Sequence, residues 1–89
     1  MFEDETPVAW NGLPRNAIVV AADGAEIGRV IHVLGDEQED IFHGLAVRRA
    51  GDGRTVEIDW PHIKRMTEQH VVTDVAAGEV DSLPAYRER

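Results

Sequence analysis

The sequence predicts a mainly β protein, a small barrel or sandwich of about six short strands with a short helix near the C-terminus. Three observations lead to this prediction. Apolar, often β-branched residues come in short runs that alternate with polar ones, and turn residues separate the runs about every eight to twelve residues. The length of 89 residues leaves room for one small hydrophobic core.

The first two strands are predicted to form a hairpin. An apolar run over 18–20 leads into Asp23-Gly24, and apolar residues resume over 26–34. Because Asp and Gly tolerate the positive φ that tight hairpin turns require, this pair predicts the turn. Gly28 lies inside the return strand, where a glycine indicates a corner of the barrel. The return strand is apolar on both faces, so we expect it to be covered on two sides.

The next two strands are predicted over 41–49 and 54–60, with Asp52-Gly53 turning the chain between them. In the first of these strands, alternation places His43 on the same face as the interior apolar residues. We therefore expect His43 to be a buried, hydrogen-bonded side chain.

The C-terminal third is predicted to contain two more short strands and a helix. Pro61 cannot donate to a sheet, so a short helical turn should precede the strand over 64–67. A turn at 68–69 then leads to the last strand over 70–73. A weak helical pattern over 75–83 follows and is ended by a proline.

The acidic balance of the chain argues against direct nucleic-acid binding. There are 17 Asp and Glu against 9 Lys and Arg, for a net charge of -8. Such a charge keeps the protein soluble and repels phosphate backbones, so binding would need a concentrated basic patch. The two patches available, Arg48 with Arg49 and Arg54, and Lys64 with Arg65, are both short.

Several features favour a cytoplasmic protein without a membrane span. The absence of cysteine excludes disulfides, thiolate metal sites and cysteine nucleophiles, and it fits a reducing compartment. The N-terminus is acidic where a signal peptide would be basic. No apolar run approaches the roughly 18 residues that a membrane helix requires.

Histidine and acidic residues form no metal-binding pattern, so we predict no metal and no cofactor. The histidines lie in different predicted elements, without the spacing of a helical ligand pair. The acidic loop over 36–40 offers oxygen ligands but lacks the Asp-x-Asp-x-Asp-Gly order of a calcium loop, which favours a solvated turn. The four histidines are His32, His43, His62 and His70.

No catalytic residues are predicted either. Glu57 and Asp59 share one strand face and could act as paired carboxylates, but the alternation assigns them to the outer, wet face. Ser82 is the only serine and lies in no Gly-x-Ser-x-Gly motif. The glycines near Asp23 lack the spacing of a phosphate-binding loop. The sequence thus predicts a protein that is not an enzyme.

Four segments, in their order and spacing, carry a family resemblance. They are V-A-A-D-G-A-E-I-G-R-V at 20–30, H-G-L-A-V-R at 43–48, V-E-I-D-W-P-H-I-K-R-M at 56–66 and V-V-T-D-V at 71–75. Together they resemble the PRC-barrel family, named for the cytoplasmic barrel of the photosynthetic reaction centre H subunit and found also in the ribosome-maturation factor RimM. The resemblance covers roughly 16–86, and it implies a small PRC-type β-barrel.

The resemblance also implies a function: an adaptor that contacts other proteins or itself and has no family-wide catalytic residues. We accordingly predict a non-catalytic module that associates with itself as a homodimer. A further, unknown protein partner is also possible. Two alternatives stay open, an RNA-processing or ribosome-assembly accessory factor acting through a protein partner, and a small-molecule or metal-binding module. Aromatic and apolar anchors dominate interfaces, and the predicted interface residues are Trp10, Phe42, Trp60, Leu83 and Tyr86.

The predicted organisation is a partly ordered arm over 1–15, a barrel over 16–86 and a tail over 87–89. The arm is polar and rich in proline, apart from Trp10. Two placements of Trp10 are open: it covers one end of its own barrel, or it packs on a partner subunit.

Overall fold

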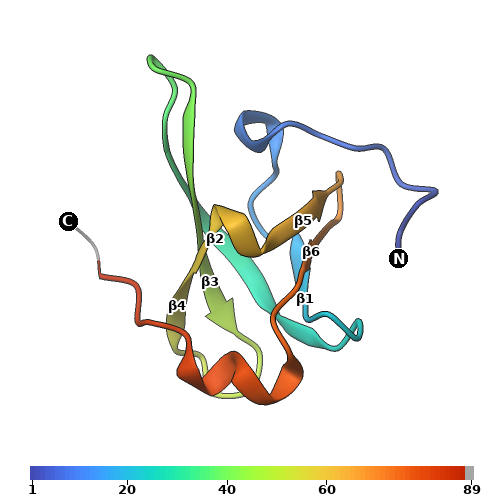
Figure 1. Cartoon of the computed structure of the whole chain (residues 1–89), viewed down its shortest axis with the longest axis vertical. Helices are drawn as coiled ribbons and strands as arrows, with labels where there is room; N and C mark the ends of the chain where they lie inside the picture. The colour runs from blue at the N-terminus through green and yellow to red at the C-terminus, as the bar shows by residue number, and fades with distance from the viewer. Residues whose placement is uncertain (88–89) are drawn as a thin grey trace.

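The computed structural model describes residues 1–87, and this part of the chain forms one six-stranded sheet with three short 3-10 helices (Figure 1). The mainly β prediction is confirmed, and the short C-terminal helix is the 3-10 helix η3. Residues 88–89 of the predicted tail lie outside the described residues. The strands are β1 (Ile18–Val20), β2 (Glu26–Asp36), β3 (Ile41–Arg49), β4 (Thr55–Asp59), β5 (Ile63–Met66) and β6 (His70–Thr73); the helices are η1 (Trp10–Gly12), η2 (Trp60–His62) and η3 (Ala77–Ser82).

The strands are arranged in the order β4-β3-β2-β1-β6-β5. Strands β1 to β4 form an antiparallel meander, β5 and β6 form an antiparallel hairpin, and β1 joins the two units by pairing in parallel with β6. The sheet curls around a single core as an open barrel, and η2 connects its two edge strands, β4 and β5 (Figure 1). Across residues 1–87, no helix is long and apolar enough to cross a membrane.

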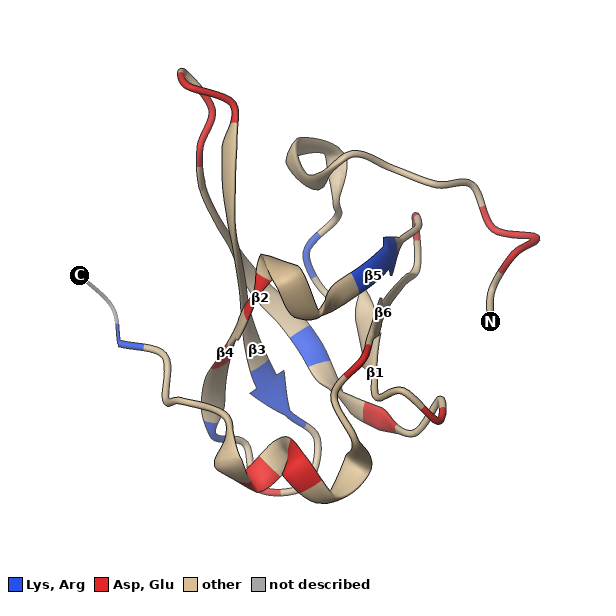
Figure 2. Cartoon of the chain, viewed as in Figure 1, with Lys and Arg blue, Asp and Glu red and all other residues tan. Residues whose placement is uncertain are grey.

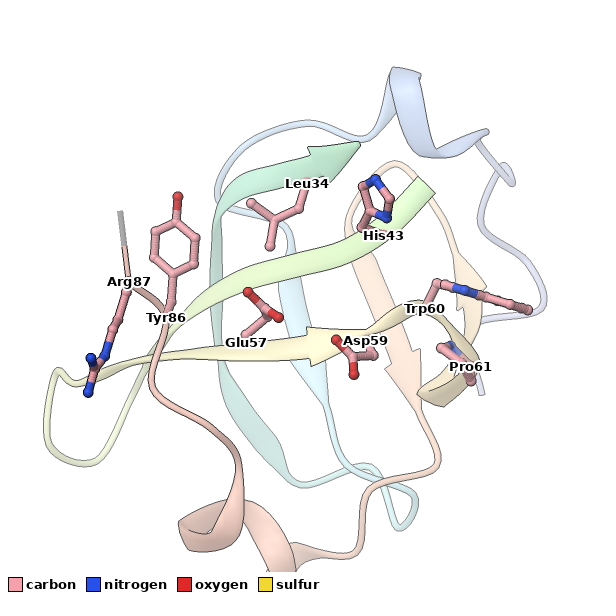
Figure 3. Close-up of a pocket in the computed structure, with 8 residues that line it drawn as sticks. All are labelled: Leu34, His43, Glu57, Asp59, Trp60, Pro61, Tyr86 and Arg87. Carbon is pink, nitrogen blue, oxygen red and sulfur yellow. The ribbon is translucent and has the colours of Figure 1, made fainter. Parts of the chain in front are cut away.

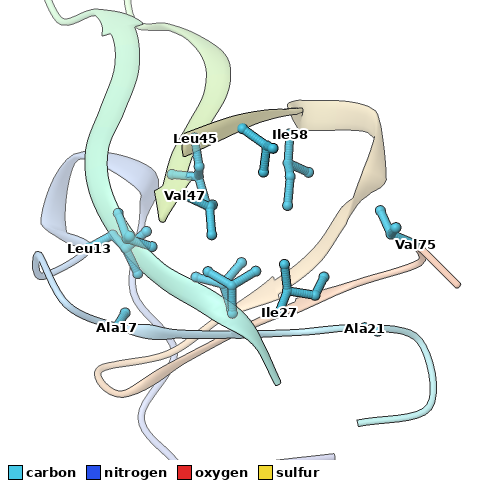
Figure 4. Close-up of a cluster of buried hydrophobic side chains, with 12 residues drawn as sticks. Leu13, Ala17, Ala21, Ile27, Leu45, Val47, Ile58 and Val75 are labelled. Atoms are coloured by element: carbon cyan, nitrogen blue, oxygen red, sulfur yellow. The ribbon is translucent and has the colours of Figure 1, made fainter. Parts of the chain in front are cut away.

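The core consists of aliphatic side chains from the inner face of the curled sheet (Figure 4). Burying each of the larger ones contributes about 1.5–3 kcal/mol. Leu13, which precedes β1, is only 7% exposed and closes one end of this core. The side chains with no exposed surface include Val19, Val30, Leu45, Val47 and Val71.

The corner at Gly28 is a close approach between two backbones. Gly28 pairs with Val19 of β1 on one side and with Arg49 of β3 on the other, and the register of β1 and β2 shifts next to it. A Cβ atom at this position would lie 1.9 Å from the carbonyl oxygen of Arg48. Only a residue without a side chain fits between these strands.

The Asp-Gly pairs form turns at which the aspartate accepts a backbone hydrogen bond. Gly24 has a φ of 92° and Gly53 a φ of 72°, both in the region that favours glycine. Oδ1 of Asp23 accepts from the Ala25 N–H at 3.0 Å. Oδ1 of Asp52 accepts in the same way from Arg54, two residues later, at 2.9 Å.

The N-terminal arm covers the free edge of β5. The Val8 N–H donates to the Met66 carbonyl at 3.0 Å, and the Glu68 N–H donates to the Thr6 carbonyl at 3.1 Å. Unpaired edge strands invite association with other chains, so this contact removes an unwanted pairing site.

The C-terminal segment covers the edge of β4 in the same manner. The Glu57 N–H donates to the Pro84 carbonyl at 2.9 Å, and the Tyr86 N–H donates to the Thr55 carbonyl at 3.0 Å. Both edges of the open barrel are therefore covered in part by the chain itself.

A small polar network anchors the arm. The Glu5 carboxylate accepts a hydrogen bond from the Thr67 hydroxyl at 2.5 Å and lies 2.8 Å and 2.9 Å from Nδ1 of His70. The ring of Phe2 stacks on His70 with a centroid distance of 3.7 Å. The hydrogen bond from Thr67, followed by that from His70, lowers the pKa of Glu5 below its ordinary value of 4.5, although desolvation opposes the shift.

The prediction that His43 is buried is wrong, and the reason is a β-bulge. Leu34 of β2 pairs with Gly44 and Gly35 pairs with Phe42, so His43 is an extra residue that has no partner across the ladder. The bulge reverses which side chains face inward. Phe42 packs against the core, whereas His43 is exposed.

Candidate functional site

A surface groove of about 610 Å³ lies on the outer face of β2, β3 and β4 (Figure 3). Its side chains come from these strands, from the start of η2 and from the C-terminal segment. The lining residues are Leu34, His43, Glu57, Asp59, Trp60, Pro61, Tyr86 and Arg87.

The groove forms because the outward residues of its middle strand are small. Gly44 on β3 lies between Leu34 and Asp59, and Ala46 lies between His32 and Glu57 in the next row. Larger side chains on β2 and β4 rise on both sides of this floor. A Cβ atom on Gly44 would also lie 2.3 Å from the Ile58 carbonyl oxygen, so the floor cannot accept a side chain there.

Two aromatic residues stand at opposite ends of the groove (Figure 3). Trp60 follows the last residue of β4 and is the first residue of η2, in which Pro61 comes next, and Trp60 is 59% exposed. Tyr86 is held at the other end because its N–H pairs with β4, and its ring lies 5.9 Å from that of His32. This contact places the C-terminal segment against His32 on the outer side of β2.

The groove wall formed by β4 is acidic. Glu57 and Asp59 are two residues apart and therefore share one face, with a rise of about 6.6 Å between them. Among residues 1–87, neither carboxylate forms an ion pair. Arg87 lies beside Tyr86 at the far end of the groove (Figure 3). Chemically, the site offers hydrogen-bond acceptors and aromatic surface to a positively charged group.

The other predicted interface residues lie elsewhere. Trp10 stacks on Phe42 of its own chain with ring centroids 5.7 Å apart, and an added Cβ at Gly35 would lie 2.9 Å from its ring. This places the Trp10–Phe42 pair where the β2–β3 hairpin leaves the barrel. Ile41, next to this pair, is 40% exposed. Leu83 packs in part against the core.

The candidate basic patch of Arg48, Arg49 and Arg54 is interrupted. Arg49 forms ion pairs with Asp52 at 3.3 Å and with Asp81 at 2.6 Å, which leaves Arg48 and Arg54 as its exposed members. Figure 2 shows Lys and Arg scattered over the molecule, while Asp and Glu gather at the tip of the β2–β3 hairpin. The ion pairs of Arg49 thus reduce the positive charge that this patch could offer to a phosphate backbone.

A second depression, of about 420 Å³, lies between η2, β6 and η3 and contains the residue types of a serine hydrolase. Nδ1 of His62 lies 2.9 Å from Oδ1 of Asp74, and this hydrogen bond, followed by one from Lys64, lowers the pKa of Asp74 below 3.8. Within the described chain, however, the hydroxyl of Ser82 makes no hydrogen bond with His62. A nucleophile needs such contact with its base, so this arrangement is not a catalytic triad.

Metal binding has no structural support in the described part of the chain. Residues 1–87 contain no group of three or more His, Asp or Glu side chains placed to hold an ion.

Sequence patterns did not predict that the lining residues come together in one groove. Glu57 and Asp59 were considered for catalysis, and Trp60 and Tyr86 for an interface, but their shared location depends on pairing between three strands and the C-terminal segment. One signal was available: small outward residues on β3, beside acidic outward residues on β4, indicate a hollow with a charged wall.

The curled sheet, the glycine corner and the partly covered edges define a small β-barrel module with a groove on its outer face. A comparison with protein-family models matches residues 13–80 to the PRC-barrel domain. The chain belongs to the PRC-barrel family, as its sequence resemblance implied. This is in general a non-catalytic domain family, and its members are often protein-interaction modules.

Proposed function

We propose that this protein is a non-catalytic adaptor that acts in the cytoplasm through protein contacts on two faces. The outer groove, with Trp60 and Tyr86, is the face for a partner protein. The base of the β2–β3 hairpin, with Trp10 and Phe42, is the face for self-association. In this proposal the barrel spans 16–86, an N-terminal arm over 1–15 supports it, and a tail over 87–89 follows. Leu83 supports the groove because it holds the C-terminal segment in place.

The exposure of Trp60 is the observation that carries the proposal. Trp60 is 59% exposed, whereas the other tryptophan of the chain, Trp10, is half-buried. Covering the exposed part would contribute roughly 2 to 4 kcal/mol, at about 25 cal/mol per Å² over about 90–150 Å². Because the termini cover part of both sheet edges, contacts with other proteins are expected to use side chains on the outer face.

Self-association is supported by the apolar surface at the hairpin base. Ile41 is 40% exposed beside the stacked rings of Trp10 and Phe42. The acidic residues at the hairpin tip would repel those of a second copy, and salt screens this repulsion. The proposal therefore expects self-association to strengthen as the ionic strength rises.

Light scattering coupled to size-exclusion chromatography tests self-association. We expect the chain, of 9.9 kDa, to elute at twice this mass at about 100 μM protein, and Ile41→Ser to shift it toward the monomer. Trp60→Ser is the matched control, because it removes an exposed apolar side chain from the other face and should leave the mass unchanged. A mass of 9.9 kDa at every concentration and salt level would refute the homodimer.

A further inference from the structure

We propose that the outer groove binds an arginine side chain, presented by an extended segment of a partner protein. This inference rests on the proposed adaptor function and names the chemistry of the partner at the same groove. The guanidinium group is expected between Glu57 and Asp59, and the flanking residues of the segment are expected to extend toward Trp60 and Tyr86.

Charge is the first argument. The two carboxylates lie on the groove side of β4, and within the part of the chain that the structure describes they have no basic partner. The surrounding protein carries a net charge of -8, so its field attracts cations and repels anionic ligands. A positively charged segment is thus the complementary occupant.

The geometry of the acceptors favours arginine over lysine. Glu57 and Asp59 are separated by about 6.6 Å along the strand, and their side chains can converge on a planar group with several donors. A guanidinium presents five N–H donors in a fixed fork and pairs with carboxylates through two parallel hydrogen bonds, whereas an ammonium is a compact point charge.

The apolar groups in the groove suit the rest of an arginine. A guanidinium stacks on aromatic faces, and the exposed Trp60, which follows Asp59 in the sequence, lines the same groove. Leu34, across β3 from Asp59, offers apolar surface to the methylene stem.

The shape of the groove favours a protein segment over a free small cation. Its volume of about 610 Å³ falls within the range of about 300–1,000 Å³ typical of ligand sites. Its lining residues extend from Trp60 at one end to Tyr86 at the other (Figure 3), so an extended chain could lie between them with one side chain directed at the strands. Gly44 and Ala46, which lie on β3 between the lining residues of β2 and β4, are small and buried and project little into this space.

A peptide titration followed by NMR tests this inference. The probe is acetyl-(Gly-Arg)3-amide, added to the ¹⁵N-labelled full chain, with the Trp60 indole N–H as reporter. We expect saturable shifts confined to the groove, weaker binding as salt increases, and weaker binding of the matched lysine peptide. The citrulline peptide, which keeps the shape without the charge, should not bind.

Paired variants separate the groove from the overall charge. Glu57→Gln with Asp59→Asn removes both acceptors' charges and should weaken binding by at least about tenfold, which corresponds to about 1.4 kcal/mol. Glu37→Gln with Glu39→Gln removes the same charge from the hairpin tip and should leave the affinity within about twofold. Equal losses in the two double variants, or equal binding of the citrulline peptide, would overturn the inference.

The outcome can be distinguished from failure of the proposed function. If the peptide leaves the groove resonances unchanged while Ile41→Ser still converts dimer to monomer, the arginine site is wrong and the self-associating module stands. If the peptide instead dissociates the dimer, the occupant of the groove is a second copy of this chain, which also overturns the inference.

Discussion

The substitution Gly28→Ala tests the account of the barrel corner. A Cβ atom at this position would lie 1.9 Å from the Arg48 carbonyl oxygen and 2.7 Å from the Arg48 carbonyl carbon. Both atoms belong to the backbone of β3, which is held in turn by β4 on its far side. Since Gly28 also pairs with Val19 of β1, β2 cannot move away without breaking a second ladder.

The magnitude follows from this geometry. Overpacking a site that can relax costs about 1–3 kcal/mol, and a collision with the backbone of β3, while β1 holds β2 from the other side, should reach about 3 kcal/mol or more. A domain of this size is stable by roughly 4 to 13 kcal/mol. The loss would lower the melting temperature by about 12 °C or more, at about 4–8 °C per kcal/mol.

Urea denaturation followed by circular dichroism measures the effect, with Gly78→Ala as the matched control. Gly78 lies in η3, where an added Cβ meets no atom within 4 Å. The control should therefore change stability by less than about 1 kcal/mol, in the stabilising direction if the loss of unfolded-state entropy dominates. If the two variants unfold at the same urea concentration, the close approach at Gly28 does not constrain the fold.

Three further predictions concern the core and the arm. Leu45→Ala should destabilise the barrel by about 2–5 kcal/mol with an unchanged urea m-value, and a loss below about 1 kcal/mol would contradict its place in the core. The folded pKa of Glu5 lies below its ordinary 4.5, so the stabilising effect of this carboxylate is complete above pH 4.5 and is lost as the pH falls through the lowered value. The Glu5→Gln variant should therefore lose less stability on acidification than the parent chain. An identical dependence of stability on pH in the two proteins would contradict the polar network. Deleting residues 1–8 uncovers the β5 edge and should produce concentration-dependent aggregation in light scattering, so a monodisperse deletion variant would show that the arm does not protect this edge.

Local sequence patterns were sufficient to predict most of the strands. Asp23-Gly24 and Asp52-Gly53 set turns through the φ values of their glycines, and two-residue alternation marks strands whatever they pair with. The alternation failed at His43, because a bulge is defined by the register of the partner strand, and the sequence of β3 alone does not contain that register.

The candidate site was less predictable for the same physical reason. Trp60 and Tyr86 could be selected as aromatic interface residues, but the groove between them requires β2, β3 and β4 to align in rows. The C-terminal segment must also pair with β4 to bring Tyr86 across to His32. These are contacts between distant parts of the chain, which periodicity does not encode.

The parallel pairing of β1 with β6 has a consequence for the order in which the barrel folds. It joins 18–20 to 70–72, about 50 residues later, whereas the other strand pairs are closed by short turns. Closing this loop costs about 2 kcal/mol more chain entropy than closing a five-residue turn. We expect the meander and the β5–β6 hairpin to form first and to dock late, so that weakening the contact between Val19 and Val71 accelerates unfolding while leaving the folding rate nearly unchanged.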